Sequence, residues 1–183
     1  RGSSAAKDGG GGRGGTLNRC VLSRNRAADS GGGSSGGMLS NCVLAGNGAS
    51  EGGGSCGGTL RNCTLTHNEA FSGGGSYGST LNNCIAYYNT AVFTSSRANW
   101  YGSGSYISHS CTTPAPGGNG NITNDPAFVD LATTNLHLRY DSPCIDGGDN
   151  SLVIGSTDLD ELQRIRNGTV DMGAYEYQWP DTD

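Results

Sequence analysis

A short motif recurs four times in the first half of the chain, at spacings of 22, 21 and 21 residues. It reads TLNRCVLSRN at 16–25, MLSNCVLAGN at 38–47, TLRNCTLTHN at 59–68 and TLNNCIAYYN at 80–89. Three columns keep this register, and they consist of Leu17, Leu39, Leu60 and Leu81, then Cys20, Cys42, Cys63 and Cys84, then Asn25, Asn47, Asn68 and Asn89. A period near 21 is too short for helical-hairpin repeats, and it suits one coil of a parallel β-helix.

The spacing inside the repeat agrees with this fold. Leu60 and Cys63 are an odd number of residues apart, whereas Cys63 and Leu65 are an even number apart. Because side chains alternate along a strand, the chain must bend between Leu60 and Cys63 if all three are to face one interior. Asn62 stands at that bend, and asparagine tolerates the left-handed backbone that a sharp corner needs. The equivalent positions are Asn41, Asn83 and the exception Arg19.

The asparagine and cysteine columns each have a structural interpretation. Strands in a sheet lie about 4.8 Å apart, so stacked asparagine amides can hydrogen bond to one another along the solenoid axis. Stacked thiols fill a narrow interior as small hydrophobic groups. The alternative for the cysteines is a metal or redox site, but metal sites favour CxxC-like clusters, which the chain lacks.

Glycine triplets lie between the motifs, at 31–33, 52–54 and 73–75, with another at 10–12. The chain of 183 residues holds 33 glycines and is only 33% hydrophobic, which disfavours a thick globular core. The triplets have two interpretations. They permit tight corners with positive φ, or they leave a flat strip where another chain or a glycan approaches the backbone.

The regular repeat ends after Asn89, and we expect rungs over 1–91, a loop excursion over 92–110, and last rungs with a C-terminal cap over 111–183, all in one domain. Clustered aromatic residues in the excursion, among them Trp100 and Tyr101, either stack on sugar rings or fold back over the column. Short strands are expected at 127–130 and 136–139. Candidates to plug the open core are Val153, Ile154, Leu159, Leu162 and Ile165.

Four segments near the C-terminus carry a family resemblance: NGNITNDPAFVD, SPCIDGGDN, TDLD and VDMGAYEY. They resemble the C-terminal signature of bacterial choice-of-anchor Q β-helix proteins, and the Gly- and Asn-rich rungs resemble the repeats of polymorphic outer-membrane proteins. Where such proteins usually read TDLDGNPR, this chain has TDLDELQR at 157–164. The resemblance implies a right-handed parallel β-helix that is extracellular or exposed on a bacterial cell surface, with no assigned catalytic residues.

These features favour a structural or adhesive protein without enzymatic activity, which in one version assembles into filaments. The alternative is a carbohydrate-active enzyme or glycan-binding module, but glycoside hydrolysis needs two carboxylates about 5 to 10 Å apart. The acids of the clear rungs are Asp29, Glu51 and Glu69, and the histidines His67, His109 and His137 share no motif. The net charge is −5 and the basic residues are scattered, which disfavours nucleic acid as a partner. No stretch approaches the roughly 20 apolar residues of a membrane span.

Three further sites are predicted. We expect a disulfide between Cys111 and Cys144, because both lie outside the cysteine column in irregular segments that a staple would fix. A structural calcium ion is one interpretation of Asp146, Asp149, Asp158 and Asp160, and capping of turns by these carboxylates is the other. The glycines Gly9, Gly10, Gly11 and Gly12 are expected to form an assembly edge, where molecules associate end to end.

Overall fold

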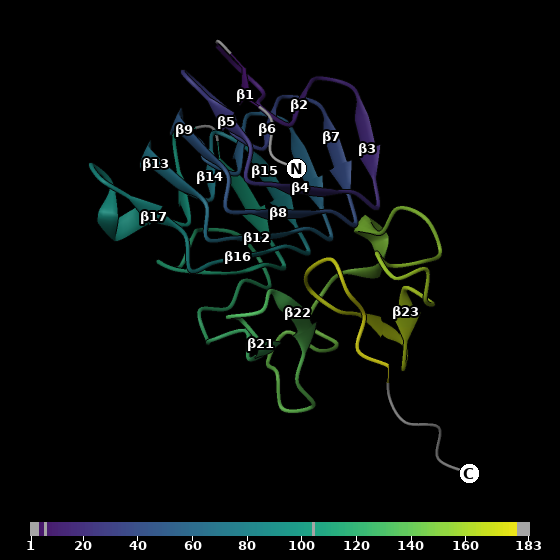
Figure 1. The fold of residues 1–183 in the computed structure, drawn as a ribbon. Coiled ribbons are helices and arrows are strands. Elements are labelled where there is room, and N and C mark those ends of the chain that lie inside the picture. Colours follow the sequence, from purple (N-terminus) through teal and green to yellow (C-terminus); the bar gives the residue numbers. More distant parts are fainter. Residues whose placement is uncertain (1–3, 6, 104, 179–183) are drawn as a thin grey trace.

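Four five-stranded parallel sheets form the walls of a β-solenoid in the computed structural model, which describes residues 4–5, 7–103 and 105–178 (Figure 1). Each turn of the chain adds one strand to every sheet. The prediction of an all-β parallel solenoid is therefore confirmed. No helix among the described residues has the length and apolarity needed to cross a membrane.

The four sheets are named here in the order in which the chain enters them. Sheet A contains β1 (Ser4–Ala5), β5 (Arg26–Ala27), β9 (Gly48–Glu51), β13 (Glu69–Ser72) and β17 (Thr90–Ala91). Sheet B contains β2 (Gly12–Arg13), β6 (Ser34–Ser35), β10 (Ser55–Cys56), β14 (Ser76–Tyr77) and β18 (Trp100–Tyr101). Sheet C contains β3 (Thr16–Asn18), β7 (Met38–Ser40), β11 (Thr59–Arg61), β15 (Thr80–Asn82) and β19 (Tyr106–Ser108). Sheet D contains β4 (Val21–Ser23), β8 (Val43–Ala45), β12 (Thr64–Thr66), β16 (Ile85–Tyr87) and β20 (Cys111–Thr112).

The register follows the sequence repeat. In sheet C, Leu60 pairs with Leu39 on one side and with Leu81 on the other. These leucines and the cysteines that follow them make up most of the central core, in which Leu60, Leu81 and Cys63 are fully buried. A narrow apolar column therefore replaces the thick core of a globular domain.

The corner between sheets C and D has the left-handed backbone expected for its asparagines. The φ angles are 51° at Asn41, 48° at Asn62 and 52° at Asn83. Arg19 adopts the same conformation, with φ of 52°, although its Cβ makes this region costly. The geometry of the rung, and not the residue type, thus fixes the corner.

Each glycine triplet forms a corner and also lets neighbouring backbones approach one another closely. Gly52 turns the chain with φ of 59°. A Cβ on Gly53 would overlap the carbonyl oxygen of Glu69, and one on Gly54 would lie 3.0 Å from the Nδ2 of Asn68. All three residues of this triplet are buried. The triplets at 31–33 and 73–75 are equally buried, so these triplets do not form an exposed strip for another chain or a glycan.

The excursion predicted for 92–110 is shorter than expected. Residues 94–97, with the 3₁₀ turn η1 (Ser95–Arg97), leave the rung. Phe93 still donates to the carbonyl of Phe71, Ser76 donates to that of Asn99, and β18 and β19 continue sheets B and C. This rung could not be recognised from the sequence, because it follows the preceding rung at a longer spacing and its motif residues differ. Ile107 pairs with Leu81, and Ser110 stands where the cysteine column would continue.

The predicted cap is present only in part. Residues 117–122 cover the edge of the last rung, where His109 and Thr112 donate their N–H groups to the carbonyls of Asn119 and Ile122, at 2.8 and 2.9 Å. The rest of the C-terminal segment packs against the side of the solenoid (Figure 1). It contains the antiparallel hairpin of β21 (Phe128–Asp130) and β22 (Asn135–Leu138), the turn η2 (Asn150–Leu152), and a second hairpin of β23 (Ile165–Arg166) and β24 (Thr169–Val170). The strands expected at 127–130 and 136–139 match the first hairpin within a residue.

Corner asparagines hold this segment in place. The Nδ2 atoms of Asn41, Asn62 and Asn83 donate to the carbonyls of Ile154, Asp171 and Asp149, at 3.3, 3.2 and 2.9 Å. The outer face of sheet D supplies the apolar contact, because Val43 and Ile85 pack against a cluster formed by Phe128, Leu136, Leu138, Cys144 and Met172. The residues expected to plug the core do not do so: Leu162 is exposed, and Val153, Ile154, Leu159 and Ile165 are half-buried.

Candidate functional site

The asparagine column forms a continuous hydrogen-bonded ladder. The Nδ2 of Asn25 donates to the Oδ1 of Asn47 at 3.0 Å, and the same contact joins Asn47 to Asn68 and Asn68 to Asn89, at 3.0 and 2.9 Å. Each Oδ1 also accepts the backbone N–H of the preceding asparagine. The four side chains are buried, so the ladder stabilises the solenoid and presents nothing to a ligand.

Asn99 extends the ladder by one step, which the repeat did not predict. Its Oδ1 accepts the Nδ2 of Asn89 at 3.1 Å, and its own Nδ2 donates to the hydroxyl of Thr113 at 2.9 Å. Asn99 is only 10 residues after Asn89. A search at a spacing of 21 residues therefore overlooks it.

The cysteine column is packed inside the solenoid. The thiols of Cys42, Cys63 and Cys84 donate to the carbonyls two residues earlier in the chain, at 3.1 to 3.2 Å. A hydrogen bond from Cys63 lowers the pKa of Cys42 to about 7, whereas burial raises the pKa of Cys63 well above its usual value. Cys20, at the first rung, is only half-buried.

Cys111 and Cys144 lie together but are free thiols, so the predicted disulfide is not present. The Cys111 thiol donates to the carbonyl of Asn124 at 3.1 Å. The neighbouring Cys111 thiol, together with burial, raises the pKa of Cys144 well above its usual value. Cys111 belongs to β20 of the regular solenoid and is fully buried. The packing of an apolar cluster, and not a covalent staple, joins the two segments here.

The four aspartates proposed as calcium ligands do not meet at one point, and the described residues contain no group of three or more metal-ligating side chains. Asp149 accepts the backbone N–H of Ser151 at 2.9 Å, as in a capped turn. The carboxylate of Asp158 accepts the backbone N–H groups of Asp160 and Glu176, both at 2.9 Å. Asp160 bonds to His137 at 2.6 Å, and Asp146 accepts the side-chain amide of Asn167 at 3.0 Å. The geometry matches the alternative in which these carboxylates brace turns.

A buried ion pair, which the sequence did not reveal, lies inside the C-terminal segment. The guanidinium of Arg164 lies 3.3 Å from Glu176, and both side chains are almost completely buried. Arg164 also donates to the carbonyl of Asp171 at 2.8 Å. Burial raises the pKa of Glu176 to about 8 and that of Asp171 to about 6. These groups organise the TDLD and VDMGAYEY segments.

The aromatic pair proposed for glycan contact is divided between two environments. Trp100 packs against the central core, its indole N–H donates to the carbonyl of Pro114 at 2.9 Å, and Arg97 lies 5.4 Å from its ring centre. The residue also lines a third pocket of about 400 Å³, beside Tyr106. Tyr101 points outward from sheet B and lies 5.8 Å from Tyr77, centre to centre.

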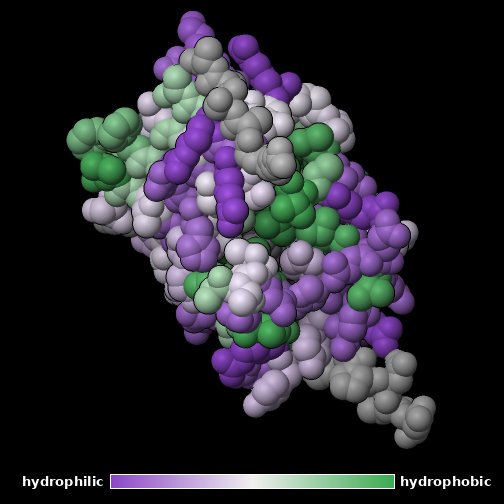
Figure 2. Space-filling model, in the orientation of Figure 1, coloured by the Kyte–Doolittle hydropathy of each residue, from purple (hydrophilic) through white to green (hydrophobic). Residues whose placement is uncertain are grey.

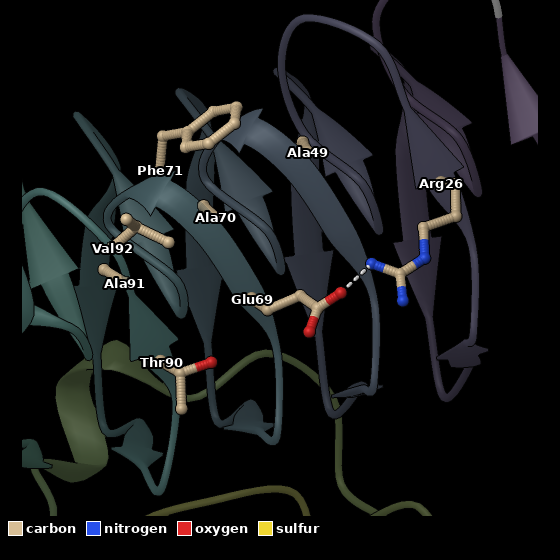
Figure 3. Close-up of a pocket in the computed structure, with 8 residues that line it drawn as sticks. All are labelled: Arg26, Ala49, Glu69, Ala70, Phe71, Thr90, Ala91 and Val92. Carbon is tan, nitrogen blue, oxygen red and sulfur yellow. Dashed lines mark hydrogen bonds and ion pairs between the residues drawn. The ribbon is translucent and has the colours of Figure 1, made fainter.

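The outer face of sheet A forms a shallow pocket of about 390 Å³ (Figure 3). Arg26 of β5 reaches across one rung to form an ion pair with Glu69 of β13. Gly48 lies beneath this pair, and a side chain there would collide with the guanidinium. Thr90 follows Glu69 in register on β17. One end of the pocket is therefore a polar row along the solenoid axis.

The other end of the pocket is apolar and exposed. The rings of Phe71 and Phe93 stack with centres 5.5 Å apart, and their exposed fractions are 51% and 77%. Val92, beside Phe71, is 69% exposed. Between the two ends, Ala49, Ala70 and Ala91 line the pocket. Figure 2 shows hydrophobic residues gathered on the left edge of the molecule, where β13 and β17 lie in Figure 1.

Sequence reasoning missed this site, although a signal was present. Phe71 and Val92 occupy a position that holds Ala28 and Ser50 in the preceding rungs. A change from small to bulky apolar residues on an outward-facing column marks a surface patch. Of the other candidates, Asp29 and Glu51 are exposed at the end of sheet A, and Glu51 donates its N–H to the carbonyl of Asp29 at 2.9 Å. The histidines lie apart, each beside a different neighbour: His67 near Tyr88, His109 near Asp149 and His137 on Tyr175.

The glycines of the proposed assembly edge form part of the first rung. Gly9 donates to the carbonyl of Ser30 at 2.9 Å and Gly10 to that of Gly31 at 3.1 Å, while Gly12 begins β2. Gly11 is exposed, and Gly9, Gly10 and Gly12 are half-buried. No protein-family model, no curated protein and no solved structure matches the chain.

Proposed function

We propose that the protein is a secreted or cell-surface adhesive scaffold that binds carbohydrate on the outer face of sheet A. One observation carries the proposal: two exposed, stacked phenylalanines adjoin a row of charged and hydroxyl groups on a rigid sheet. The resemblance of the C-terminal segments to bacterial surface proteins points in the same direction. The extracellular or bacterial-surface location is part of the proposal.

The chemistry of the face suits a sugar ring. The C–H bonds on one face of a pyranose are attracted to the negative face of an aromatic ring, as other positively polarised groups are. Phe71 supplies such a ring beside the alanine floor of the pocket. Glu69, Arg26 and Thr90 offer acceptors and donors for sugar hydroxyls at the opposite end (Figure 3). Because backbone ladders hold all of these strands, little conformational freedom is lost on binding.

We propose binding without catalysis. Glu69 is the carboxylate lining the pocket, and it forms an ion pair with Arg26. A hydrolytic site would need a second carboxylate within about 5 to 10 Å of it. Incubation with pectin, alginate and related polymers, followed by assays for reducing and unsaturated ends, tests the enzymatic alternative. New chain ends would overturn the non-catalytic version.

We also propose end-to-end self-association, as an adhesive filament would require. Within the described residues, β1, β2, β3 and β4 are the outermost strands of their sheets, and an unpaired parallel edge accepts further strands. The edge includes Gly9–Gly12. Electron microscopy of the purified protein tests this, since fibres are expected, and particles that stay monomeric at high concentration would contradict it.

The glycan site is tested by an array of surface oligosaccharides probed with the wild-type protein. A variant carrying Phe71→Ala and Phe93→Ala should bind the recognised glycans at least tenfold more weakly, because burial of two aromatic rings contributes more than about 1.4 kcal/mol. Tyr106→Ala is the matched control, since Tyr106 is 74% exposed on sheet C and should be neutral. Unchanged binding by the double variant, or no binding to any glycan, would refute the proposal.

A further inference from the structure

A second and larger pocket, of about 590 Å³, lies between sheet D and the C-terminal segment. One wall comes from the first two rungs and contains Val21, Val43 and Ala45. The other wall contains Leu131 and Leu136, together with the turn between β21 and β22. This groove between sheet D and the first C-terminal hairpin is separate from the pocket on sheet A, which is lined by none of the same residues.

The groove has an apolar interior that is only partly filled. Val43 and Leu136 are buried by packing between the two walls, at 4% and 2% exposure. Val21 continues the same outward-facing column of sheet D, in register with Val43, but is 60% exposed. The C-terminal segment thus covers Val43 and leaves Val21, the first residue of the column, exposed to solvent. A ligand with an apolar chain would complete this cover.

Polar side chains also line the groove, and they are Ser23, Arg24, His67, Thr134 and Tyr175. Arg24 stands at the corner after β4, with its stem near Gly46, 3.8 Å from where a Cβ on that glycine would be. Among the described residues no carboxylate forms an ion pair with Arg24, although most other exposed arginines of the solenoid have one. Asp130, which precedes the opposite turn, accepts the backbone N–H of Ala132 at 3.0 Å. Ser23, Thr134 and Tyr175 provide hydroxyl donors in the same groove.

We infer that this groove binds an amphiphilic carboxylate, with the apolar chain against Val21, Val43 and Leu136 and the carboxylate on Arg24. Charge complementarity selects the head group, because an unpaired guanidinium gains a strong hydrogen-bonded partner in a carboxylate. The apolar walls select the tail. A sugar would leave its hydroxyls unpaired against these valines and leucines, which is unfavourable. The inference is independent of the carbohydrate site on sheet A.

Octanoate tests the inference by isothermal titration of the full chain. It should bind at a single site, and Arg24→Gln should weaken binding about tenfold through loss of a charged hydrogen bond. Ala132→Trp, at an exposed position of the turn, should abolish binding by filling the groove. Arg13→Gln removes an exposed arginine of sheet B and is the matched control, with no expected effect.

Octyltrimethylammonium, which has the same chain and the opposite charge, separates recognition of the head group from general apolar binding. It should bind at least tenfold more weakly than octanoate. Circular dichroism and thermal melting of each variant establish that its fold is intact. No octanoate binding at millimolar concentration, equal binding of the two ions, or binding that survives Ala132→Trp in a folded variant would each overturn the inference.

Discussion

The side-chain amide and the backbone N–H of Asn47 both donate to a single atom, the Oδ1 of Asn68, at 3.0 and 2.9 Å. The Nδ2 of Asn68 in turn reaches the carbonyl of Leu44 at 2.8 Å and the Oδ1 of Asn89 at 2.9 Å. One buried asparagine therefore satisfies polar groups on two neighbouring rungs. Because these groups have no access to water, each needs a hydrogen-bond partner within the protein, and the ladder supplies it.

Asn68→Ala should destabilise the protein by about 2 to 4 kcal/mol, because it removes the acceptor of the buried backbone N–H of Asn47 and the hydrogen bonds to Leu44 and Asn89. Urea unfolding followed by circular dichroism measures this. Asn119→Ala, at an exposed loop position, is the control and should change stability by less than about 0.5 kcal/mol. Equal effects of the two variants would mean that the ladder contributes no special stability.

Gly54→Ala should be far more damaging than Gly57→Ala, although only Gly57 has a positive φ, of 66°. A Cβ on Gly54 would overlap the carbonyl of Gly75 and crowd Asn68, whereas one on Gly57 would meet nothing within 4 Å. Gly57→Ala should cost about 1 to 2 kcal/mol, from backbone strain alone. Soluble expression and melting temperature distinguish the two. A better tolerated Gly54→Ala would disprove the close approach.

The sequence allowed the solenoid, its period and its corners to be predicted because every rung repeats the same local requirements. Asn62, for example, is both a corner residue and a member of a column, so two independent patterns point to it. The rung containing Ile107 and Ser110 was missed because it keeps the geometry but changes the residue types. The backbone hydrogen bonds of a rung require an extended strand, but they do not require the side chains of the motif.

The place of the C-terminal segment could not be deduced from the sequence. The contact of Asn83 with Asp149 joins residues 66 apart, and no periodicity links them. The segment lies beside the solenoid and accepts hydrogen bonds from the side chains of Asn41, Asn62 and Asn83. In the sequence these asparagines indicate only turns. The sheet A site was overlooked for a similar reason, since Arg26 and Glu69 are 43 residues apart and meet only across the rung of Gly48.

Stability should fall as pH rises from about 5 to 8. Burial raises the pKa of Asp171 to about 6 and that of Glu176 to about 8, so the native state retains protons that the unfolded chain has released. Their stabilising effect is complete below the unfolded values near 4 and is lost as pH passes the native values. Melting temperatures across this range measure it. Glu176→Gln should flatten the upper part of the profile, and a wild-type melting temperature that rises with pH would contradict the prediction.

All seven cysteines should react with a thiol reagent after denaturation without reductant, because each is a free thiol. In the native protein only Cys20 and Cys56 should react quickly, since both are half-buried while the other five are buried. Access separates the two groups, because burial raises the pKa of Cys20 and Cys56 as well as that of Cys63. Mass spectrometry of labelled peptides identifies the sites. Unlabelled Cys111 and Cys144 after denaturation would show that a disulfide joins them.

The central claim, that an adhesive solenoid binds carbohydrate on sheet A, is tested most directly by NMR titration with the oligosaccharide that binds best on the array. Amide signals of β9, β13 and β17 should shift on binding, with the largest changes near Phe71 and Phe93. Signals of Trp100 and Tyr101 on sheet B should remain in place. Shifts confined to Trp100 and Tyr101, or to the C-terminal hairpins, would contradict the account.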